Sequence, residues 1–381
     1  MLTFVNRDTI DDLKRRLTSA TGEYAYLRFE MEQAAAVRFA QGPRSVTCSK
    51  SGAVSGNPHD YYSIGPYWWP DPNADDPKTA PYIRRDGEVN PEYNDCRHKQ
   101  DFDDLSIAVH TLVTAGFYLS KRAYLDRAAE LIHVWFLNEE TKMNPHLEYA
   151  QAIQGICAGR GIGIIELSAL DRIVHSLGYL EEAGGYEQLI AAFNMWLNQM
   201  LDWLLTSKNG IDESKNGNNH ETYYWMRAGL YGFWLGRPDS VNLMCKNYTE
   251  RIIPLQIEPD GAMIRELGRT RSLRYSLYNL DAMAMTCEIA RVNGVDLWRF
   301  NDGERSIETA IRYLIPALKN PYDWRFREIS SDVPPDTFAM QFAALRLNRP
   351  DLTAINRLRR DQMRLWRYQA ISPPALLEGY S

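Results

Sequence analysis

Two amides and an imidazole stand side by side at Asn218-Asn219-His220, directly after Gly217 and before an apolar segment. Amide groups can hydrogen-bond a carboxylate, and an imidazole can take up or release a proton near neutral pH. The same residues could also begin a helix, with Asn218 as its N-cap and Glu221 completing a capping box. The two interpretations are compatible, because the N-terminus of a helix presents free N–H groups and favours an anion.

Four arginines lie in the ten residues before Tyr275, with one acidic residue among them. The arginines are Arg265, Arg269, Arg271 and Arg274, and the acidic residue is Glu266. Guanidinium groups stabilise a phenolate, so we expect the pKa of Tyr275 to fall toward a range useful for proton transfer. Helical spacing favours Arg271 as the partner of Tyr275, whereas Arg269 would reach it only if the segment is partly non-helical. The alternative is a solvated first turn of a helix that begins near Leu277.

Residues 42–100 hold many of the prolines and glycines and show no sustained hydrophobic period. A loop of this length is uncommon in a compact domain and is often functional. It carries a cluster of flat, amphipathic rings of the kind on which sugar rings stack. The cluster comprises Tyr61, Tyr62, Tyr67, Trp68 and Trp69. An interdomain linker is the alternative, although such a cluster would be unusual in a flexible tether.

Other chemistries have weaker support. The seven histidines form no metal-ligand motif, so we expect neither a metal nor another cofactor. The glycines at alternate positions in residues 159–163 lack the preceding strand and the Lys-Ser/Thr pair of a phosphate loop. Asp101, Asp103 and Asp104 cluster in sequence, which is more typical of a helix start than of the paired carboxylates of a glycoside hydrolase.

Helices must position these groups, because helical periodicity dominates the chain outside the long loop. The expected helical segments are 9–40, 105–119, 124–136, 164–180, 186–205, 222–235, 240–253, 277–292, 303–318, 336–347 and 352–369. Successive helices joined by short turns form antiparallel hairpins, and about a dozen would close into an incomplete helical toroid. We therefore expect an all-α fold that forms a single domain over residues 1–381.

The net charge, the cysteine count and the length of the apolar runs restrict the possible binding partners and location. A net charge of −6 argues against a nucleic-acid-binding surface. The five cysteines are scattered and form no disulfide framework, and no apolar run approaches the length of a membrane span. Acidic residues interrupt the first fifteen positions, so the sequence is typical of a cytoplasmic protein, or of a secreted or periplasmic one already trimmed of its signal peptide. Nothing in it indicates an oligomeric state.

The chain resembles the alginate lyase family of polysaccharide lyases over most of residues 55–290. The resemblance rests on four stretches, of which the aromatic one is the most specific. They are His59-Asp60-Tyr61-Tyr62-Ser63 with Pro66-Tyr67-Trp68-Trp69-Pro70; Tyr149-Ala150-Gln151 with Gly159-Arg160-Gly161; Asn218-Asn219-His220 with Thr222 and Tyr224; and Glu266-Leu267 with Arg269-Thr270, Ser272, Tyr275-Ser276 and Asn279-Leu280. The fold of that family is an incomplete helical toroid, and its substrates are anionic polysaccharides.

The resemblance implies a role for each matched residue. Asn219 and His220 would neutralise or orient a uronate carboxylate, Arg269 would support it, and Tyr275 would transfer protons. The expected substrate-binding residues are Tyr67, Trp68, Trp69, Gln151, Arg160, Asn218, Tyr224, Arg271 and Asn279. The chain departs from the family pattern after His220, where Glu221-Thr222-Tyr223 stands in place of Gly-Thr-Trp, and this departure leaves the sugar open.

The implied reaction is β-elimination on a 1,4-linked polyuronate, which removes the proton at C5 and protonates the departing O4. Alginate containing mannuronate is the favoured substrate, and glucuronan is the main alternative. A helical-toroid glycoside hydrolase would release products without a double bond. A carbohydrate-binding module that uses Trp68 and Trp69 would bind without turnover.

Overall fold

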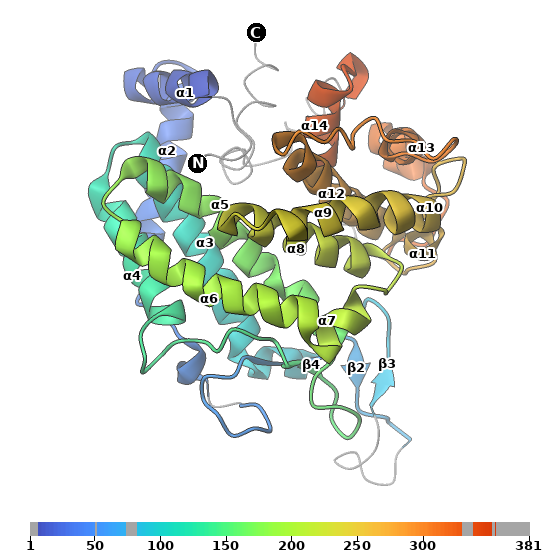
Figure 1. Ribbon diagram of the computed structural model, residues 1–381, viewed down its shortest axis with the longest axis horizontal. Coiled ribbons are helices and arrows are strands. Elements are labelled where there is room, and N and C mark those ends of the chain that lie inside the picture. The colour runs from blue at the N-terminus through green and yellow to red at the C-terminus, as the bar shows by residue number, and fades with distance from the viewer. Residues whose placement is uncertain (1–6, 50–51, 74–81, 330–337, 353–354, 356–381) are drawn as a thin grey trace. The chain divides into compact units, whose positions relative to one another are not determined.

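The computed structural model describes residues 7–49, 52–73, 82–329, 338–352 and 355 (Figure 1). The chain divides into two compact units: unit 1 comprises most of the first 213 residues, and unit 2 begins at Ser214 and also takes in the start of the first helix. Both units are built mainly of helices, as expected. The expectation of a single domain stays a prediction.

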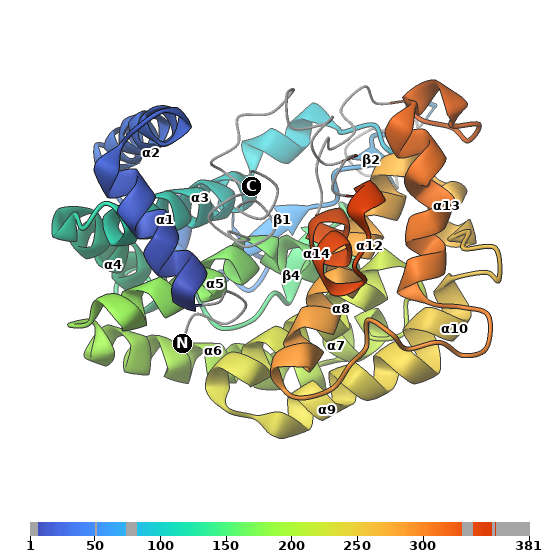
Figure 2. The ribbon, with the colours of Figure 1, turned by 90° about the horizontal axis from the view of Figure 1, so that it is seen from above.

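Unit 1 is built around α3, which is buried on almost every side from Leu105 to Tyr118. A helix that is apolar all round must be covered by neighbours, and α2, α4 and α5 pack against α3 (Figures 1 and 2). The helices up to the unit boundary are α1 (Arg7–Ser19), α2 (Glu23–Phe39), α3 (Arg97–Tyr118), α4 (Arg122–Phe136), α5 (Ser168–Ala183), α6 (Glu187–Thr206) and α7 (Lys208–Glu213).

The long loop is more ordered than its sequence suggests. It contains β1 (Tyr62–Ile64), β2 (Trp68–Trp69) and β3 (Ile83–Arg84), together with 3₁₀ turns at Val46–Cys48 and Pro91–Asp95. Strand β1 pairs in parallel with β4 (Tyr149–Ala152), beside which it lies in Figure 2. Strands β2 and β3 form an antiparallel pair. The described parts of the segment are thus held by backbone pairing, which is unlike a flexible tether. Strands this short show no alternation that a sequence pattern could reveal.

Unit 2 is centred on α8 (Asn219–Leu235) and α12 (Ser272–Val292), which pack against each other and are buried over most of their length. The other helices are α9 (Pro238–Asn247), α10 (Ile253–Gln256), α11 (Ile264–Leu267), α13 (Ile307–Lys319) and α14 (Phe338–Arg346), with a π turn at Tyr248–Ile252. Both central helices begin earlier than the apolar periodicity predicted, at Asn219 instead of Thr222 and at Ser272 instead of Leu277. The expected helix at residues 352–369 falls almost entirely outside the described residues.

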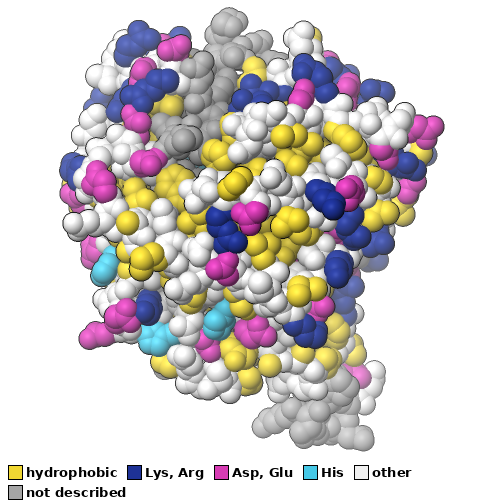
Figure 3. All heavy atoms as spheres, viewed as in Figure 1, with side chains coloured by type: hydrophobic (Ala, Val, Ile, Leu, Met, Phe, Trp, Pro, Cys, Tyr) yellow, Lys and Arg dark blue, Asp and Glu magenta, His cyan; other side chains and the backbone are white. Residues whose placement is uncertain are grey.

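The described helices include none that is long and apolar enough to span a membrane. On the face drawn in Figure 3, lysine and arginine side chains are interspersed with aspartate and glutamate. Such mixed charge is typical of an ordinary solvated surface. The expected location of the protein stays a prediction.

A buried carboxylate connects α12 to α14 in unit 2. Glu288 has no exposed surface, and its oxygens accept hydrogen bonds from Arg291 (2.9 Å to Nη2), Arg346 (2.9 Å to Nε) and the Trp298 indole (2.8 Å). Burial acts to raise the pKa of Glu288, but the hydrogen bonds from Arg346 and Arg291 outweigh it and hold the pKa below its ordinary value of 4.5. The folded state therefore favours the ionised carboxylate.

We predict that Glu288→Gln lowers the free energy of unfolding by about 3 kcal/mol at neutral pH, because it leaves two arginines facing a neutral amide. A depressed carboxyl pKa stabilises the fold above the unfolded-state value, and this stabilisation is lost as pH falls through the lower, folded-state value. Urea unfolding between about pH 7 and about pH 3 should therefore show a flatter acid limb for this variant than for the wild type. The exposed Glu258→Gln is the matched control. An acid limb unchanged by Glu288→Gln would contradict the assignment.

Candidate functional site

The N-terminus of α8 carries the Asn-Asn-His motif. The side chain of Asn218 accepts a hydrogen bond from the backbone N–H of His220 (2.9 Å), so Asn218 is the N-cap as predicted. The side chain of Glu221 reaches back one residue further than a capping box would, to the N–H of Gly217 (2.6 Å). Glu221 is also buried and pairs with Arg251 (2.7 Å). The cap holds His220, which is half-buried, in the first turn of the helix.

Asn219 is held by a carboxylate that the sequence analysis did not assign to the site. The two oxygens of Glu266, in α11, accept hydrogen bonds from the backbone N–H (2.7 Å) and from the side-chain amide (2.8 Å) of Asn219. Both residues are only 1% exposed. A signal was present, because Glu266 is the only acidic residue in the arginine run. Its partner lies 47 residues earlier, however, and no local pattern connects the two.

The charge of Glu266 acts on two further site residues. Burial raises the pKa of this carboxyl, while the hydrogen bonds from Asn219 and the nearby charges of Arg269 and His220 act in the opposite direction. The net shift is upward. Ionised Glu266 therefore depends on these neighbours and in turn supplies a negative charge that attracts the Arg269 guanidinium.

Arg269 lies on the ring of Tyr275. The centre of its guanidinium is 3.9 Å from the ring centroid, within the range of a cation–π contact. This is possible because α11 ends at Leu267 and α12 begins at Ser272, so that the chain between them is non-helical. Arg271, which helical spacing favoured, is the N-cap residue of α12. The family resemblance thus selected the arginine that the structure brings to Tyr275.

The start of α12 is held by residues from late in unit 2. Glu328 accepts hydrogen bonds from the N–H groups of Leu273 (3.0 Å) and Arg274 (3.3 Å), and Arg271 forms an antiparallel bridge with Glu328. A carboxylate at a helix N-terminus satisfies otherwise unpaired N–H groups. The turn that carries Tyr275 is therefore fixed at its start.

Tyr224 and Asn279 lie in the core of unit 2. Tyr224 is 2% exposed and packs edge-on against Trp225. Asn279 is buried, and its amide donates to the side-chain oxygen of Gln256 (3.0 Å), which also accepts from Thr222 (3.0 Å). Their burial favours a structural role between α8 and α12, and direct contact with a ligand stays a prediction for both.

Unit 1 brings together another set of the expected binding residues. The guanidinium of Arg160 donates to the backbone carbonyl of Gln151 (3.0 Å) and to its side-chain oxygen (3.0 Å). Its centre lies 5.7 Å from the ring centroid of Trp68. Burial lowers the pKa of Arg160, so its charge is poorly solvated and would be stabilised by an anion. This arrangement can bind an acidic group beside an aromatic ring.

The neighbouring aromatic residues are held by the β2–β3 pair. The Trp69 indole donates to the carbonyl of Glu88 (3.0 Å), and the Arg85 guanidinium lies 4.9 Å from the Trp69 ring centroid. Tyr67 is half-buried, and its carbonyl accepts from the N–H of Arg85 (2.8 Å). Tyr67, Trp68 and Trp69 therefore belong to one ordered segment.

The glycines around Arg160 allow a close approach to β4. A Cβ atom on Gly159 would lie 2.0 Å from the carbonyl oxygen of Glu148, and one on Gly163 would lie 2.5 Å from Cβ of Ala150. Only glycine fits at such distances. The glycine-rich segment thus has a packing role that brings Arg160 to Gln151.

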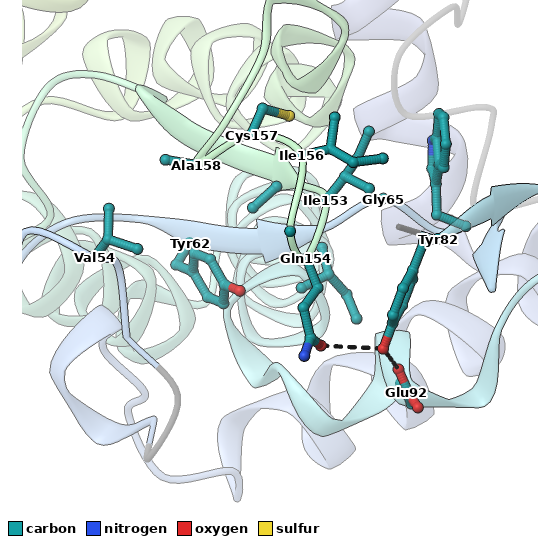
Figure 4. Close-up of a pocket in the computed structure, with 14 residues that line it drawn as sticks. Val54, Tyr62, Gly65, Tyr82, Glu92, Ile153, Gln154, Ile156, Cys157 and Ala158 are labelled. Atoms are coloured by element: carbon teal, nitrogen blue, oxygen red, sulfur yellow. Dashed lines mark hydrogen bonds between the residues drawn. The ribbon is translucent and has the colours of Figure 1, made fainter. Parts of the chain in front are cut away.

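A pocket of about 470 Å³ opens beside Trp68 in unit 1 (Figure 4). Its lining is mainly apolar, and the Tyr82 hydroxyl within it donates to Glu92 (2.7 Å) and lies 3.1 Å from the side-chain oxygen of Gln154. Burial, together with Glu92, raises the pKa of Tyr82 to about 12, so the phenol stays protonated. Pockets that combine rings with a few polar groups are typical of small-ligand sites.

The described residues contain no group of three or more His, Cys, Asp or Glu side chains that could hold a metal ion. The groups brought together in unit 2 are amides, an imidazole, a guanidinium and a phenol. They can bind an anion and transfer a proton without an added cofactor.

Comparisons with known proteins give the family. The sequence model named Alginate lyase matches residues 45–324. The crystal structure of an alginate lyase from Bacteroides ovatus is similar with a TM-score of 0.90 and 30% identity, covering 97% of this chain and 98% of that one. This match confirms the expected fold class, an all-α incomplete toroid. An alginate lyase from Cobetia marina is 32% identical over 119 residues, which span 30% of either protein. The chain belongs to the alginate lyase family of polysaccharide lyases.

Proposed function

We propose that this protein cleaves a 1,4-linked polyuronate, with mannuronate-containing alginate as the preferred substrate, by β-elimination. The observation that carries the proposal is the contact of the Arg269 guanidinium with the Tyr275 ring in unit 2, where the negative charge of Glu266 also attracts Arg269. Membership of the family and the name of the similar Bacteroides ovatus enzyme support the choice of substrate.

The first requirement of the reaction is to quench the charge of the sugar carboxylate, because only then is the C5 proton acidic enough to be removed. His220 and Arg269 supply hydrogen-bond donors and positive charge for this purpose. Asn219 is the third member of the group. Its amide donates to Glu266, which fixes the orientation of its side chain.

The second requirement is proton transfer. The base takes the C5 proton, the C–H electron pair forms the C4–C5 double bond, and the C4–O4 bond breaks as O4 receives a proton. In mannuronate and glucuronate, H5 and O4 lie on the same face of the ring, so Tyr275 can serve as base and then as acid. In guluronate they lie on opposite faces, and His220 would be the base with Tyr275 as the acid.

The Arg269 contact favours Tyr275 as the base. A cation held 3.9 Å from the ring centroid stabilises the phenolate more than the phenol. A tyrosine that can lose its proton suits the same-face reaction, and this is the physical reason for preferring mannuronate to guluronate.

Unit 1 supplies the binding residues of the proposal. Arg160, held by Gln151, would pair with a uronate carboxylate, and Trp68 would stack on the apolar face of a sugar ring. Tyr67, Trp69, Asn218 and Arg271 remain proposed contacts. The partner is thus an anionic polysaccharide or an oligosaccharide derived from it.

The test of the function is to incubate the protein with polymannuronate, polyguluronate and glucuronan and to follow the ultraviolet absorbance of unsaturated uronate ends. We expect the fastest rise on polymannuronate. Products without the double bond would instead indicate a hydrolase. The absence of a signal on all three polymers would overturn the proposal.

We predict that Tyr275→Phe lowers kcat by about 10³-fold, because the phenol performs the proton transfer. The variant should retain the melting temperature of the wild type, since only one half-exposed hydroxyl is removed. Tyr322→Phe is the matched control, because Tyr322 is 96% exposed, and its activity should equal that of the wild type. A Tyr275→Phe enzyme with normal kcat would remove Tyr275 from its role.

Glu266→Gln should lower kcat/KM by about tenfold to a hundredfold. The amide would place a donor against one of the two donors of Asn219 and would remove the charge that attracts Arg269, at a cost of about 1–3 kcal/mol. Steady-state kinetics on the preferred polymer would measure the loss. Glu250→Gln, on the exposed surface of unit 2, is the control. Equal activity of the two variants would show that Glu266 does not organise the site.

A further inference from the structure

Unit 1 contains a buried carboxylate that the proposed mechanism does not use. Glu166, in the 3₁₀ helix Gly161–Leu167, is 2% exposed. One of its oxygens, Oε2, accepts hydrogen bonds from the hydroxyls of Tyr61 (2.7 Å) and Ser63 (2.7 Å). Burying a carboxylate is costly unless hydrogen bonds or opposite charges compensate it. The direction of these two hydrogen bonds indicates what the Glu166 carboxylate does.

Ser63 links the Glu166 carboxylate to Gln151 through hydrogen bonds. A serine hydroxyl has one proton, and Ser63 donates it to Glu166. The lone pairs of Ser63 Oγ are then free to accept, and one of them receives the backbone N–H of Gln151 (2.8 Å). Because the Ser63 proton points to Glu166, the Ser63 oxygen is oriented to accept a hydrogen bond from the backbone of β4. The side chains of Ser63 and Gln151 are both buried.

Gln151 needs such support because its backbone is strained. Its φ is +50°, in the left-handed region that a glutamine seldom occupies and that costs about 1 kcal/mol. In this conformation its backbone carbonyl and its side-chain oxygen both face Arg160, at 3.0 Å from Nε and Nη2 respectively. An ordinary strand conformation would turn one of these acceptors away.

We propose that Ser63 and Glu166 are positioning residues, which hold Gln151 in the left-handed conformation and so fix the Arg160 guanidinium beside Trp68 for a uronate carboxylate. The inference rests on the proposed function for the identity of the ligand. It adds that substrate affinity in unit 1 is set by a buried carboxylate that never touches the substrate. The chain of contacts runs from Glu166 through Ser63 and Gln151 to Arg160.

The central variant is Ser63→Ala, which leaves the Gln151 N–H without its acceptor and frees the strained backbone. We expect KM to rise about tenfold while kcat changes by less than about twofold, since one lost hydrogen bond is worth about 1 kcal/mol and the proton-transfer groups are untouched. In an Arg160→Ala background, Ser63→Ala should change KM by less than about twofold relative to Arg160→Ala alone, because the guanidinium that Gln151 positions is absent. Full additivity of the two changes would overturn the proposal.

Tyr61→Phe is the matched control. This variant removes the other hydrogen bond to the same carboxylate oxygen, which also has a length of 2.7 Å. It leaves the hydrogen bond between Ser63 and the Gln151 N–H intact. We expect a loss of stability similar to that of Ser63→Ala, measured by thermal melting, with KM at the wild-type value. Equal KM values for Tyr61→Phe and Ser63→Ala would show that the network has only a structural role.

A second pair of variants covers the case in which Ser63→Ala does not fold. Glu166→Gln keeps an acceptor for Ser63 and should retain KM, whereas Glu166→Met offers none and should raise KM about tenfold. Equal KM values for this pair would contradict the proposal.

Hydrogen exchange separates this inference from the proposed function. The amide of Gln151 should exchange about tenfold faster in Ser63→Ala than in the wild type, whatever the substrate is. Unchanged protection overturns the positioning role. Wild-type protein that forms no unsaturated ends from any polyuronate overturns the function alone.

Discussion

The pair of hydrogen bonds between Asn219 and the buried Glu266 carboxylate is the contact on which the proposed chemistry of unit 2 depends. A carboxylate without solvent must be matched by donors and by nearby positive charge. Asn219 supplies the donors, and Arg269 and His220 supply charge. The group that would transfer the proton, Tyr275, is then placed by its contact with Arg269.

Unit 1 also contains a buried carboxylate that holds an amide residue. A buried glutamate, Glu166, again holds an amide residue through short hydrogen bonds, here by way of Ser63. The held residue, Gln151, in turn orients an arginine. In both units a carboxylate with no access to solvent therefore fixes a guanidinium. Pre-organised donors of this kind lose little free energy to reorganisation when an anion binds.

Part of this could be predicted from residues close in sequence. The cap at Asn218 follows from the preference of asparagine for that position, and the pairing of Arg269 with Tyr275 came from the resemblance to the family, against the helical spacing that favoured Arg271. The strands of the long loop and the residue Glu166 were not identified, and Ser63 and Glu266, although they lie in the quoted stretches, were given no role. Ser63 and Glu166 lie 103 positions apart, and Asn219 and Glu266 lie 47 positions apart. No local periodicity can connect such pairs.

By itself, the sequence determined the all-α class, the approximate extent of most described helices and the residue types available for catalysis, because helical periodicity and capping are local properties of the chain. It also identified the family through four short motifs. Only the tertiary structure decided which carboxylates are buried, which donors those carboxylates bind, and why Gln151 adopts a strained backbone. Those outcomes depend on desolvation and on hydrogen bonds between distant segments, and the free energy of such contacts exists only once the chain has packed.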